Sequence, residues 1–451
     1  IQNGRPITQV SVQERLPTQV FAARAGGIWI AGMSHIRRWH QGAWREERVR
    51  TNVRQRTWTN TWTETSEGIL AATTFDEGLL LIPHDGQEKQ VALPEGLPSP
   101  HISALIEDSE GNLWLGSGDQ GLCQLRPRSV TLLNPPDGWR TRAVQSVIES
   151  ADGALWAATE GAGLYRYREN EWTHYDQQAG LTNQVVKTLT ETSRGEILVG
   201  LSSGGVLRLE KEEFLPLLTR FRPSLITAIF EDSQRRLWLG GLAGPSLVRG
   251  ENVSSIVPKN QGRLTHITAF AESPDGTVWI GSLGYGLGRY QNGVLTVLHR
   301  QDGLPSDYIW SLRVSKDGTL WIGTYDRGLV SHREGRFALI STEQGLPGNR
   351  VGQIVEDKIG QIWLGTEGGI ACVERDDLDR CTQGLVERIT PTIFDLSEGL
   401  ASLGLAGGNQ NTACLTQNGS LLFATDQGLA QIEPHVFRKP AQPVSMVIDA
   451  V

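Results

Sequence analysis

One motif recurs along this chain at a nearly constant interval, and that interval limits the folds open to it. The motif SKDGTLWIGTYDRG (315–328) has close copies at 107–121, 150–163 and 273–286. The position of Trp321 occurs ten times, and neighbouring copies lie 40 to 44 residues apart except for a last step of 59. Such a period is typical of arrays built from one supersecondary unit. We name this position the anchor, and it is held by Trp29, Leu70, Trp114, Trp156, Leu198, Trp238, Trp279, Trp321, Trp363 and Leu422.

Each unit reads as four short strands separated by turns. In one unit, strand-like segments occupy 101–108, 113–117, 122–126 and 129–134, with SEGN and DQG as the first two turns. Gly in such turns supplies the positive φ that a tight hairpin needs. Four antiparallel strands in about 42 residues match one blade of a β-propeller. The sequence therefore predicts an all-β propeller of ten four-stranded blades, with the anchor side chain packed between neighbouring blades.

The ends of the array indicate how a ring could close. The last unit supplies only three strands, and ITQVSVQERL (7–16) has the alternation of a single strand ahead of the first unit. We therefore predict one ring from residues 17–437, with residues 1–16 as the strand that completes the last blade and leaves no free edge. Two smaller rings are the alternative, because ten blades exceed the usual four to eight. The long last step places an insert at 376–395, at the outer edge of the ninth unit.

Composition and charge argue against several classes of protein. The 451 residues carry a net charge of −8 without a long basic run, which argues against nucleic-acid binding. No apolar stretch approaches the roughly 18 residues of a membrane-spanning helix, so we expect no membrane contact by this chain. Four cysteines form no CxxC pair, so we expect no zinc site. Cys372 and Cys381 are either buried free thiols or a pair bonded across a hairpin.

Short Gly-Leu segments precede the first strand of several units. Each is followed by the anchor motif and then by GLxRY or a variant of it. This order of motifs resembles the two-component regulator propeller repeat of bacterial sensor proteins, over nearly the whole chain. The Gly-Leu segments are GLPSP (96–100), GLTNQ (180–184), GLPSD (303–307) and GLPGN (345–349).

The same resemblance extends to the end of the chain. The last unit resembles the family's last propeller repeat, and KPAQPVSMVIDAV (439–451) resembles the first strand of the immunoglobulin-like domain that follows it. We therefore expect residues 438–451 to begin that domain or a linker. One departure is the repeat number, since such sensors often carry about fourteen repeats in two rings and this chain has ten.

The resemblance implies a function as well as a fold. It implies a periplasmic ligand-sensing module of an inner-membrane receptor, with a transmembrane helix beyond Val451 and a homodimer formed through that further part. The output domain would be a histidine kinase, a hybrid one, or a diguanylate cyclase. The implied ligand is a small molecule or an oligosaccharide, with no cofactor. The chain begins at Ile1 rather than Met, so we expect a processed or trimmed product.

Catalytic motifs are not found in this sequence. It contains no HExxH motif and no Walker loop. Acidic residues sit mostly in hairpin turns, where we expect them to be solvated. We therefore predict that the chain is not an enzyme. A propeller polysaccharide lyase or glycosidase is one alternative, which sustained turnover would reveal. A protein-interaction platform is the other, and it would bind a periplasmic protein instead of a small ligand.

The candidate site follows from positions that depart from the repeat. Thirteen residues before each anchor, at the start of the predicted inner strand, the residue type varies toward polar and aromatic. Loops after the second strand should lie on the same face. Aromatic rings suit sugars, and Arg suits carboxylate or sulfate groups. The predicted ligand-binding residues are His101, Trp139, Arg142, His266, Tyr308, Trp310, Tyr325, Arg327 and Arg350.

Two positions after the start of each predicted inner strand, the residues are mostly small and polar. They include Ser103, Gln145, Lys187, Thr227 and Thr268, and could line a wet central channel. Trp310 occupies the same position and is the exception. It either plugs the channel or stacks on a ligand, and the sequence does not choose between the two.

Overall fold

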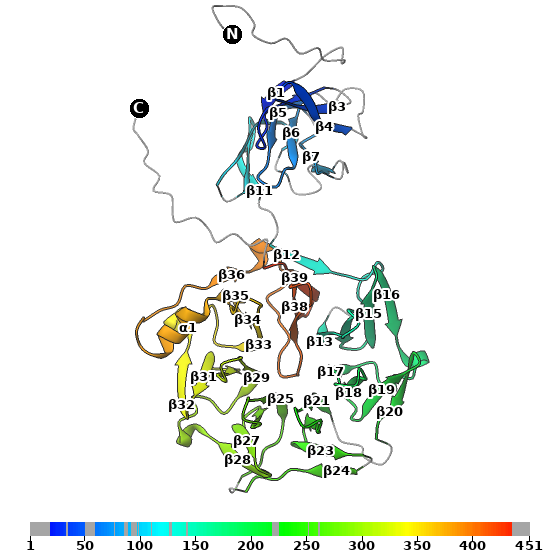
Figure 1. Cartoon of the computed structure of the whole chain (residues 1–451), viewed down its shortest axis with the longest axis vertical. Coiled ribbons are helices and arrows are strands. Elements are labelled where there is room, and N and C mark those ends of the chain that lie inside the picture. The colour runs from blue at the N-terminus through cyan, green and yellow to red at the C-terminus, as the bar shows by residue number, and fades with distance from the viewer. Residues whose placement is uncertain are drawn as a thin grey trace, which may run out of the picture. The chain divides into compact units, whose positions relative to one another are not determined.

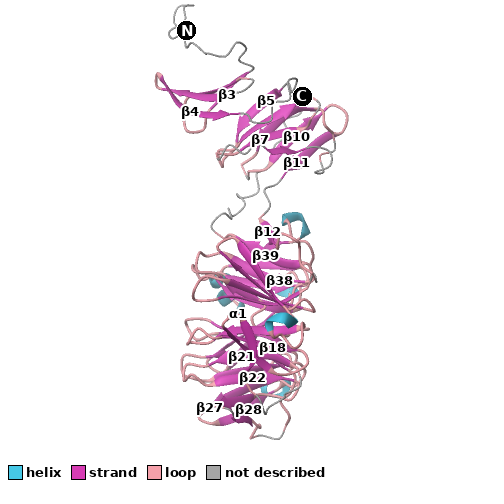
Figure 2. Ribbon diagram, turned by 90° about the vertical axis from the view of Figure 1, so that its right-hand side faces the viewer, coloured by secondary structure: helices cyan, strands magenta, loops and turns pink. Residues whose placement is uncertain are grey.

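The computed structural model describes residues 19–434, apart from 33–34, 50–58, 76, 85–88, 92–96, 98, 110, 126–128, 141–142, 219–224, 251 and 260–261. The chain forms two compact units, one from Ile1–Pro127 with Arg438–Val451 and one from Arg128–Phe437. Strands and loops dominate, and the helices are short (Figure 2). Among the described residues, no helix is long and apolar enough to cross a membrane. The expected strand at 1–16 and the segment 438–451 lie outside the described residues.

The described residues form ten antiparallel sheets, and the second strand of each contains an anchor. This confirms the all-β fold and the repeating unit. The first unit holds three sheets, in which β5 of the middle sheet contacts β1 and β9 of its neighbours. Their strands are β1 (Gln19–Ala22), β2 (Ile28–Ala31), β3 (His35–His40) and β4 (Ala43–Val49); β5 (Thr59–Glu64), β6 (Leu70–Thr74), β7 (Leu79–Ile82) and β8 (Lys89–Val91); and β9 (Ile102–Glu107), β10 (Leu113–Ser117) and β11 (Gly121–Leu125).

The second unit holds the other seven sheets. Six of them run in simple order from the inner to the outer strand. They are β13 (Val144–Glu149), β14 (Leu155–Thr159), β15 (Leu164–Arg168) and β16 (Glu171–Tyr175); β17 (Val186–Glu191), β18 (Ile197–Leu201), β19 (Val206–Glu210) and β20 (Glu213–Pro216); β21 (Ile226–Glu231), β22 (Leu237–Gly241), β23 (Ser246–Arg249) and β24 (Asn252–Ser255); β25 (Ile267–Glu272), β26 (Val278–Ser282), β27 (Leu287–Gln291) and β28 (Val294–Leu298); β29 (Ile309–Val314), β30 (Leu320–Thr324), β31 (Leu329–Arg333) and β32 (Arg336–Ile340); and β33 (Val351–Glu356), β34 (Ile362–Thr366), β35 (Gly369–Val373) and β36 (Thr392–Phe394).

The seventh sheet joins the two ends of this unit. It contains β12 (Val130–Leu133), β37 (Ala413–Leu415), β38 (Leu421–Thr425) and β39 (Gly428–Ile432) in the order β12-β39-β38-β37. The inner strands β13, β17, β21, β25, β29, β33 and β37 contact one another in succession, and β37 also contacts β13. Seven sheets therefore surround one centre (Figure 1). The prediction of one ring of ten blades is not confirmed, because these seven close among themselves.

The strand that completes the last sheet is β12, and this corrects the prediction that residues 1–16 would do so. Val130 pairs with Ile432 and Leu133 with Leu429 in antiparallel register. The sequence pattern placed 129–134 as the fourth strand of the third unit instead. Alternation of apolar residues is the same whichever sheet edge a strand joins, so the pattern did not reveal its partner. Among the described residues, the third sheet accordingly has only β9, β10 and β11.

The insert at 376–395 lies at the outer edge of the ninth sheet, as expected. It contains most of the helix α1 (Arg375–Thr382), which contacts β32, and it ends in β36. The other helices of the described residues are single turns of 3-10 type ahead of four inner strands: η2 (Gln177–Ala179), η3 (Arg300–Asp302), η4 (Thr342–Gln344) and η5 (Leu396–Glu398).

Six anchor tryptophans donate their indole N–H to the residue six positions earlier. Trp363 donates to Asp357 at 2.9 Å, and Trp238 donates to Asp232 at 2.7 Å. Both aspartates are buried, so the expectation that acidic turn residues are solvated is wrong for these two, while Asp152, Asp275 and Asp317 are exposed. The remaining pairs are Trp114 with Asp108, Trp156 with Ser150, Trp279 with Ser273 and Trp321 with Ser315. Where the anchor is Leu198 or Leu422, the sixth residue before it is Thr192 or Thr416.

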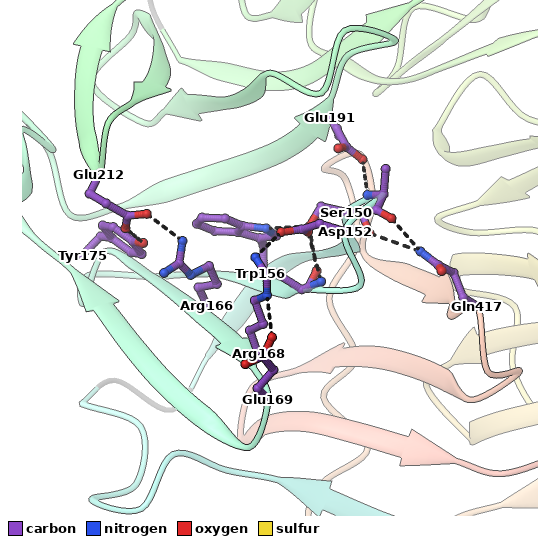
Figure 3. A network of polar contacts seen from close by, with 12 residues as sticks. Ser150, Asp152, Trp156, Arg166, Arg168, Glu169, Tyr175, Glu191, Glu212 and Gln417 are labelled. Carbon is purple, nitrogen blue, oxygen red and sulfur yellow. Dashed lines mark hydrogen bonds and ion pairs between the residues drawn. The ribbon is translucent and has the colours of Figure 1, made fainter.

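Neighbouring sheets are tied by a glutamate at the end of the inner strand. Glu191 accepts the backbone N–H of Ala151 from the preceding sheet at 2.8 Å, and Glu272 accepts that of Ser233 at 2.7 Å. Figure 3 shows the first of these ties beside the Trp156 anchor, with Gln417 of the last sheet reaching the same turn. Each tie satisfies a turn N–H that the hairpin itself leaves free.

Candidate ligand-binding face

The two loop sets expected to share a face do share one. In four sheets of the second unit, the residue after the second strand donates its backbone N–H to the residue before the inner strand of the same sheet. Tyr325 donates to Tyr308 at 2.9 Å, and Leu283 donates to His266 at 2.9 Å. Glu160 and Ser202 make the same bond with Ala143 and Val185. We name the end of the ring that carries these residues the top face.

Trp310, Tyr325 and Arg350 form a cation–aromatic cluster on this face. The guanidinium of Arg350 lies 4.5 Å from the ring centroid of Tyr325 and 5.6 Å from that of Trp310. The two rings meet edge to face at 4.8 Å, and Arg350 Nη2 donates to the Tyr325 hydroxyl at 3.3 Å. Tyr325 remains 41% exposed and Arg350 is also exposed. The cluster thus presents a positive charge beside aromatic surface, and the sequence prediction had named all three residues.

The backbone beneath this cluster is fixed by Glu367. Its carboxylate accepts the backbone N–H of Asn349 at 2.9 Å and that of Arg350 at 2.7 Å. Glu367 follows β34, so one sheet supplies both the arginine and the carboxylate that orients its main chain. The carboxylate is therefore engaged with backbone donors.

A segment that precedes β37 fills the centre of the ring. We name residues 404–412 the central segment; Figure 1 shows this loop reaching into the middle of the seven sheets. The backbone N–H of Gln410 donates to Thr227 O at 2.8 Å, and its C=O accepts from Ser146 Oγ at 3.0 Å. Its side-chain amide pairs with both backbone groups of Phe270, each at 3.2 Å. One glutamine therefore joins three inner strands.

Other residues of the central segment reach two further inner strands. Asn411 Nδ2 donates to Leu189 O on β17 at 2.6 Å. The C=O of Thr412 accepts from Gln353 Nε2 on β33 at 2.9 Å. These bonds correct the expectation of a wet channel, because polypeptide occupies the centre. Gly-Gly-Asn-Gln-Asn at 407–411 is the sequence signal that could have indicated this role.

Trp310 packs against the central segment as well as against Tyr325. A Cβ on Gly408 would lie 2.7 Å from its indole nitrogen, and one on Gly407 would lie 3.0 Å from Cε3. Glycine is thus needed at both positions for this close approach. Part of the Trp310 side chain is covered by the segment, while its half-buried ring still borders the exposed Tyr325 and Arg350.

A polar cluster borders the other side of the central segment. Asn409 Nδ2 donates to Gln145 Oε1 at 2.9 Å, and Lys187 Nζ donates to the same oxygen at 3.2 Å. Gln145 Nε2 donates to Glu160, which also forms an ion pair with Lys187 at 3.5 Å. Because Gly408 and Asn409 are consecutive, this cluster and Trp310 flank one short stretch of chain. The predicted ligand-binding residues do not include these four, although Gln145 and Lys187 were expected to line the channel.

His266, Tyr308 and Arg327 also lie on the top face. His266 stacks on Tyr285 with ring centroids 5.5 Å apart and adopts a left-handed backbone, with φ of 52°. Tyr308 is 48% exposed and neighbours Gly284. Arg327 is exposed in the turn after Tyr325. Tyr308 and Arg327 flank strands of the same sheet as Tyr325, and His266 flanks a strand of the preceding sheet.

The other three predicted residues differ in where they lie. His101 lies in the first unit, where its Nδ1 is 2.7 Å from Phe75 O. Trp139 meets Tyr165 and Trp172 edge to face and donates to Asn134, as a packed residue does. Arg142 lies outside the described residues.

Within the described part of the chain, no group of three or more His, Cys, Asp or Glu is placed to hold a metal ion. All four cysteines are free, including Cys372 and Cys381. Burial raises the pKa of the Cys414 thiol to about 12, so this thiol stays protonated near neutral pH.

The fold defines this part of the chain as a β-propeller repeat array. Residues 96–119, 303–326 and 345–368 match the two component regulator propeller family, which confirms the resemblance seen in the sequence. These three segments begin at the Gly-Leu motifs and end after the second strand of a sheet. No curated protein matches this sequence.

Solved structures show the same fold at low sequence identity. The extracellular domain of BT3049 from B. thetaiotaomicron, described as a hybrid two component system, superposes with a TM-score of 0.69 at 18% identity. The alignment covers 96% of this chain and 60% of that domain, so the chain spans less than two thirds of that relative. Virginiamycin B lyase from Staphylococcus aureus aligns with a TM-score of 0.53 at 13% identity, over 68% of this chain and 99% of the lyase.

Proposed function

We propose that this chain is the extracytoplasmic ligand-sensing part of a bacterial signal-transduction receptor. The family match and the likeness to extracellular domains of hybrid two component systems support a propeller of the sensor type. A periplasmic location, an output domain beyond this chain and a homodimer formed through that further part belong to the same proposal. Signalling by such a receptor requires that a ligand binds the sensor and changes its conformational equilibrium.

The cation–aromatic cluster is the observation that carries the binding proposal. Its accessible members are Tyr325 and Arg350, and the exposed ring of Tyr308 lies on the same face. Aromatic rings bury the apolar face of a sugar, while hydroxyl and guanidinium groups make directional hydrogen bonds. A small molecule or an oligosaccharide is therefore the proposed ligand of the top face.

Binding without turnover is part of the proposal. A lyase shares the propeller fold, but a likeness of 13% identity concerns the fold and not the reaction. On the top face, the carboxylate of Glu367 accepts backbone N–H groups and that of Glu160 is paired with Lys187. Both carboxylates thus have structural partners.

Calorimetry against plant and bacterial oligosaccharides tests this function. We expect saturable binding by the parent chain and weaker binding by Tyr325→Ala. Arg194→Ala, in the turn between β17 and β18 at the opposite end of the sheets, is the control and should bind as the parent does. The same mixtures are assayed for new reducing ends and for unsaturated products. Sustained turnover would favour a lyase or glycosidase, and capture of a periplasmic protein without any saccharide binding would favour an interaction platform.

A further inference from the structure

Arg350 differs from Lys187, the cation of the polar cluster, in its charge balance. Lys187 is neutralised by Glu160 at 3.5 Å. Within the described part of the chain, no carboxylate lies within the 4.0 Å ion-pair distance of the Arg350 guanidinium. One of its nitrogens donates to the Tyr325 hydroxyl, and the guanidinium carries five N–H donors in all. Donors therefore remain for an external acceptor.

The neighbouring carboxylates are already committed to other partners. Glu367 accepts two backbone N–H groups, from Asn349 and Arg350. Asp326 accepts the hydroxyl of Ser306 at 2.5 Å. Each of these bonds orients a loop of the top face, so freeing either carboxylate to pair with Arg350 would cost the loop a hydrogen bond. An anionic ligand could pair with Arg350 without breaking these hydrogen bonds.

The guanidinium is also held in place before any ligand arrives. Stacking over Tyr325 at 4.5 Å, with Trp310 at 5.6 Å, restricts a side chain that is otherwise rich in rotamers. Trp310 is in turn restricted by Gly407 and Gly408 of the central segment. A preorganised guanidinium loses less conformational entropy when it binds a ligand. Its planar fork of N–H donors also suits a planar acceptor that takes two hydrogen bonds.

We propose, resting on the ligand-binding function above, that Arg350 binds the carboxylate of an acidic sugar on the top face. The sugar ring lies against the exposed aromatic surface of Tyr308 and Tyr325, which are 48% and 41% exposed. The polar cluster across the central segment carries the paired charges of Lys187 and Glu160, so it suits neutral hydroxyl groups. The preferred ligand thus has one anionic end and a neutral remainder.

Three small probes separate the contributions of charge and ring. Glucuronate carries both a carboxylate and a pyranose ring, glucose carries the ring alone, and acetate carries the charge alone. Each is titrated to roughly 50 mM, a range that detects millimolar dissociation constants. The readout is the side-chain Nε–Hε NMR signal of Arg350, assigned from its absence in the spectrum of Arg350→Lys.

We expect glucuronate to shift this signal saturably, with an affinity about tenfold or more above those of glucose and acetate. In Arg350→Ala, glucuronate binding followed by backbone signals should fall about tenfold to hundredfold, as loss of a charge-assisted hydrogen bond predicts. Arg194→Ala removes an equal charge at the opposite end of the sheets and should leave the affinity unchanged. Arg350→Lys keeps the charge but not the planar fork, and should retain an intermediate affinity.

The proposal fails if glucuronate produces no saturable shift, if glucose binds as tightly, or if Arg350→Ala retains the parent affinity. Acetate binding as tightly as glucuronate would overturn the sugar part and leave a simple anion site. Failure here is distinguishable from failure of the sensing function. An oligosaccharide that binds the parent chain in calorimetry and loses affinity in Tyr325→Ala would uphold a top-face site for a neutral ligand.

Discussion

The backbone N–H of Gln417 donates to Glu149 Oε2 at 2.5 Å, across 268 positions of sequence. Gln417 lies in the β37–β38 turn of the last sheet, and Glu149 ends β13 of the first sheet in the ring. The same bond joins Ala151 to Glu191 between consecutive sheets. The seam between the two ends of the unit is therefore built like its other seams, and no special closing contact is needed beyond β12.

Removal of β12 should destabilise the seven-sheet unit. A chain of residues 128–437 is expected to fold, whereas one of residues 135–437 should melt at a lower temperature and less cooperatively. Its β39 would lose a paired neighbour and expose an edge. Thermal melts followed by circular dichroism measure the difference. Deletion of residues 1–16 from the full chain is the matched control, and it should leave the melting of this unit unchanged. Equal melting of the two fragments would contradict the role of β12.

Gln410→Ala should weaken the ring from its centre. The change removes both amide bonds to the backbone of Phe270 and leaves a buried N–H and C=O with fewer partners. We expect a loss of about 1–3 kcal/mol in the free energy of unfolding. Denaturant titration measures it, with Gln301→Ala in an exposed turn as the control, expected within about 0.5 kcal/mol of the parent. A stability unchanged from the parent would mean that the backbone hydrogen bonds of the central segment are enough to hold it against the inner strands.

Anchor and turn residues should be energetically coupled. Asp357→Thr leaves the buried indole N–H of Trp363 without its carboxylate partner, and Trp363→Leu leaves the carboxylate without that donor. The double variant reproduces the Leu–Thr pairing seen at Leu198 and Leu422. We therefore expect the double variant to lose less free energy of unfolding than the two single variants lose together, by about 1 kcal/mol or more. Strictly additive losses in a double-mutant cycle would refute this coupling.

Acid should loosen the seam between the sheets of β13–β16 and β17–β20. The hydrogen bond from Tyr175 and the ion pair with Arg166 hold the pKa of Glu212 below its ordinary value of 4.5 (Figure 3). A lowered folded pKa contributes stability above the unfolded value, and this stability is lost as pH falls through the folded value. The side chain is 59% exposed, so the contribution is small, within about 1 kcal/mol.

Denaturant titrations at pH 7 and near pH 3 detect this contribution when the parent is compared with Glu212→Gln. The parent should lose more stability than the variant on acidification, because glutamine does not titrate. Glu171→Gln, an exposed glutamate in β16, serves as the control and should follow the parent. Identical acid responses of parent and Glu212→Gln would show that this ion pair does not stabilise the seam.

The sequence by itself determined the repeating unit, its strands and its anchors. These depend on contacts between residues that are close in sequence or one repeat apart, such as the alternation of strands, the glycines of the turns and the packing of Trp321 against the next sheet. It also placed Tyr308, Trp310, Tyr325 and Arg350 on one face, because backbone pairing fixes which loops of a sheet share an end.

Only the tertiary structure decided which sheets close into a ring and what fills its centre. A strand such as Val130–Leu133 offers the same hydrogen-bonding edge to β11 and to β39, so its partner depends on the geometry of closure rather than on its own residues. Gln410 likewise carries no local signal of its partners, because Thr227 and Phe270 become its neighbours only when the inner strands surround it.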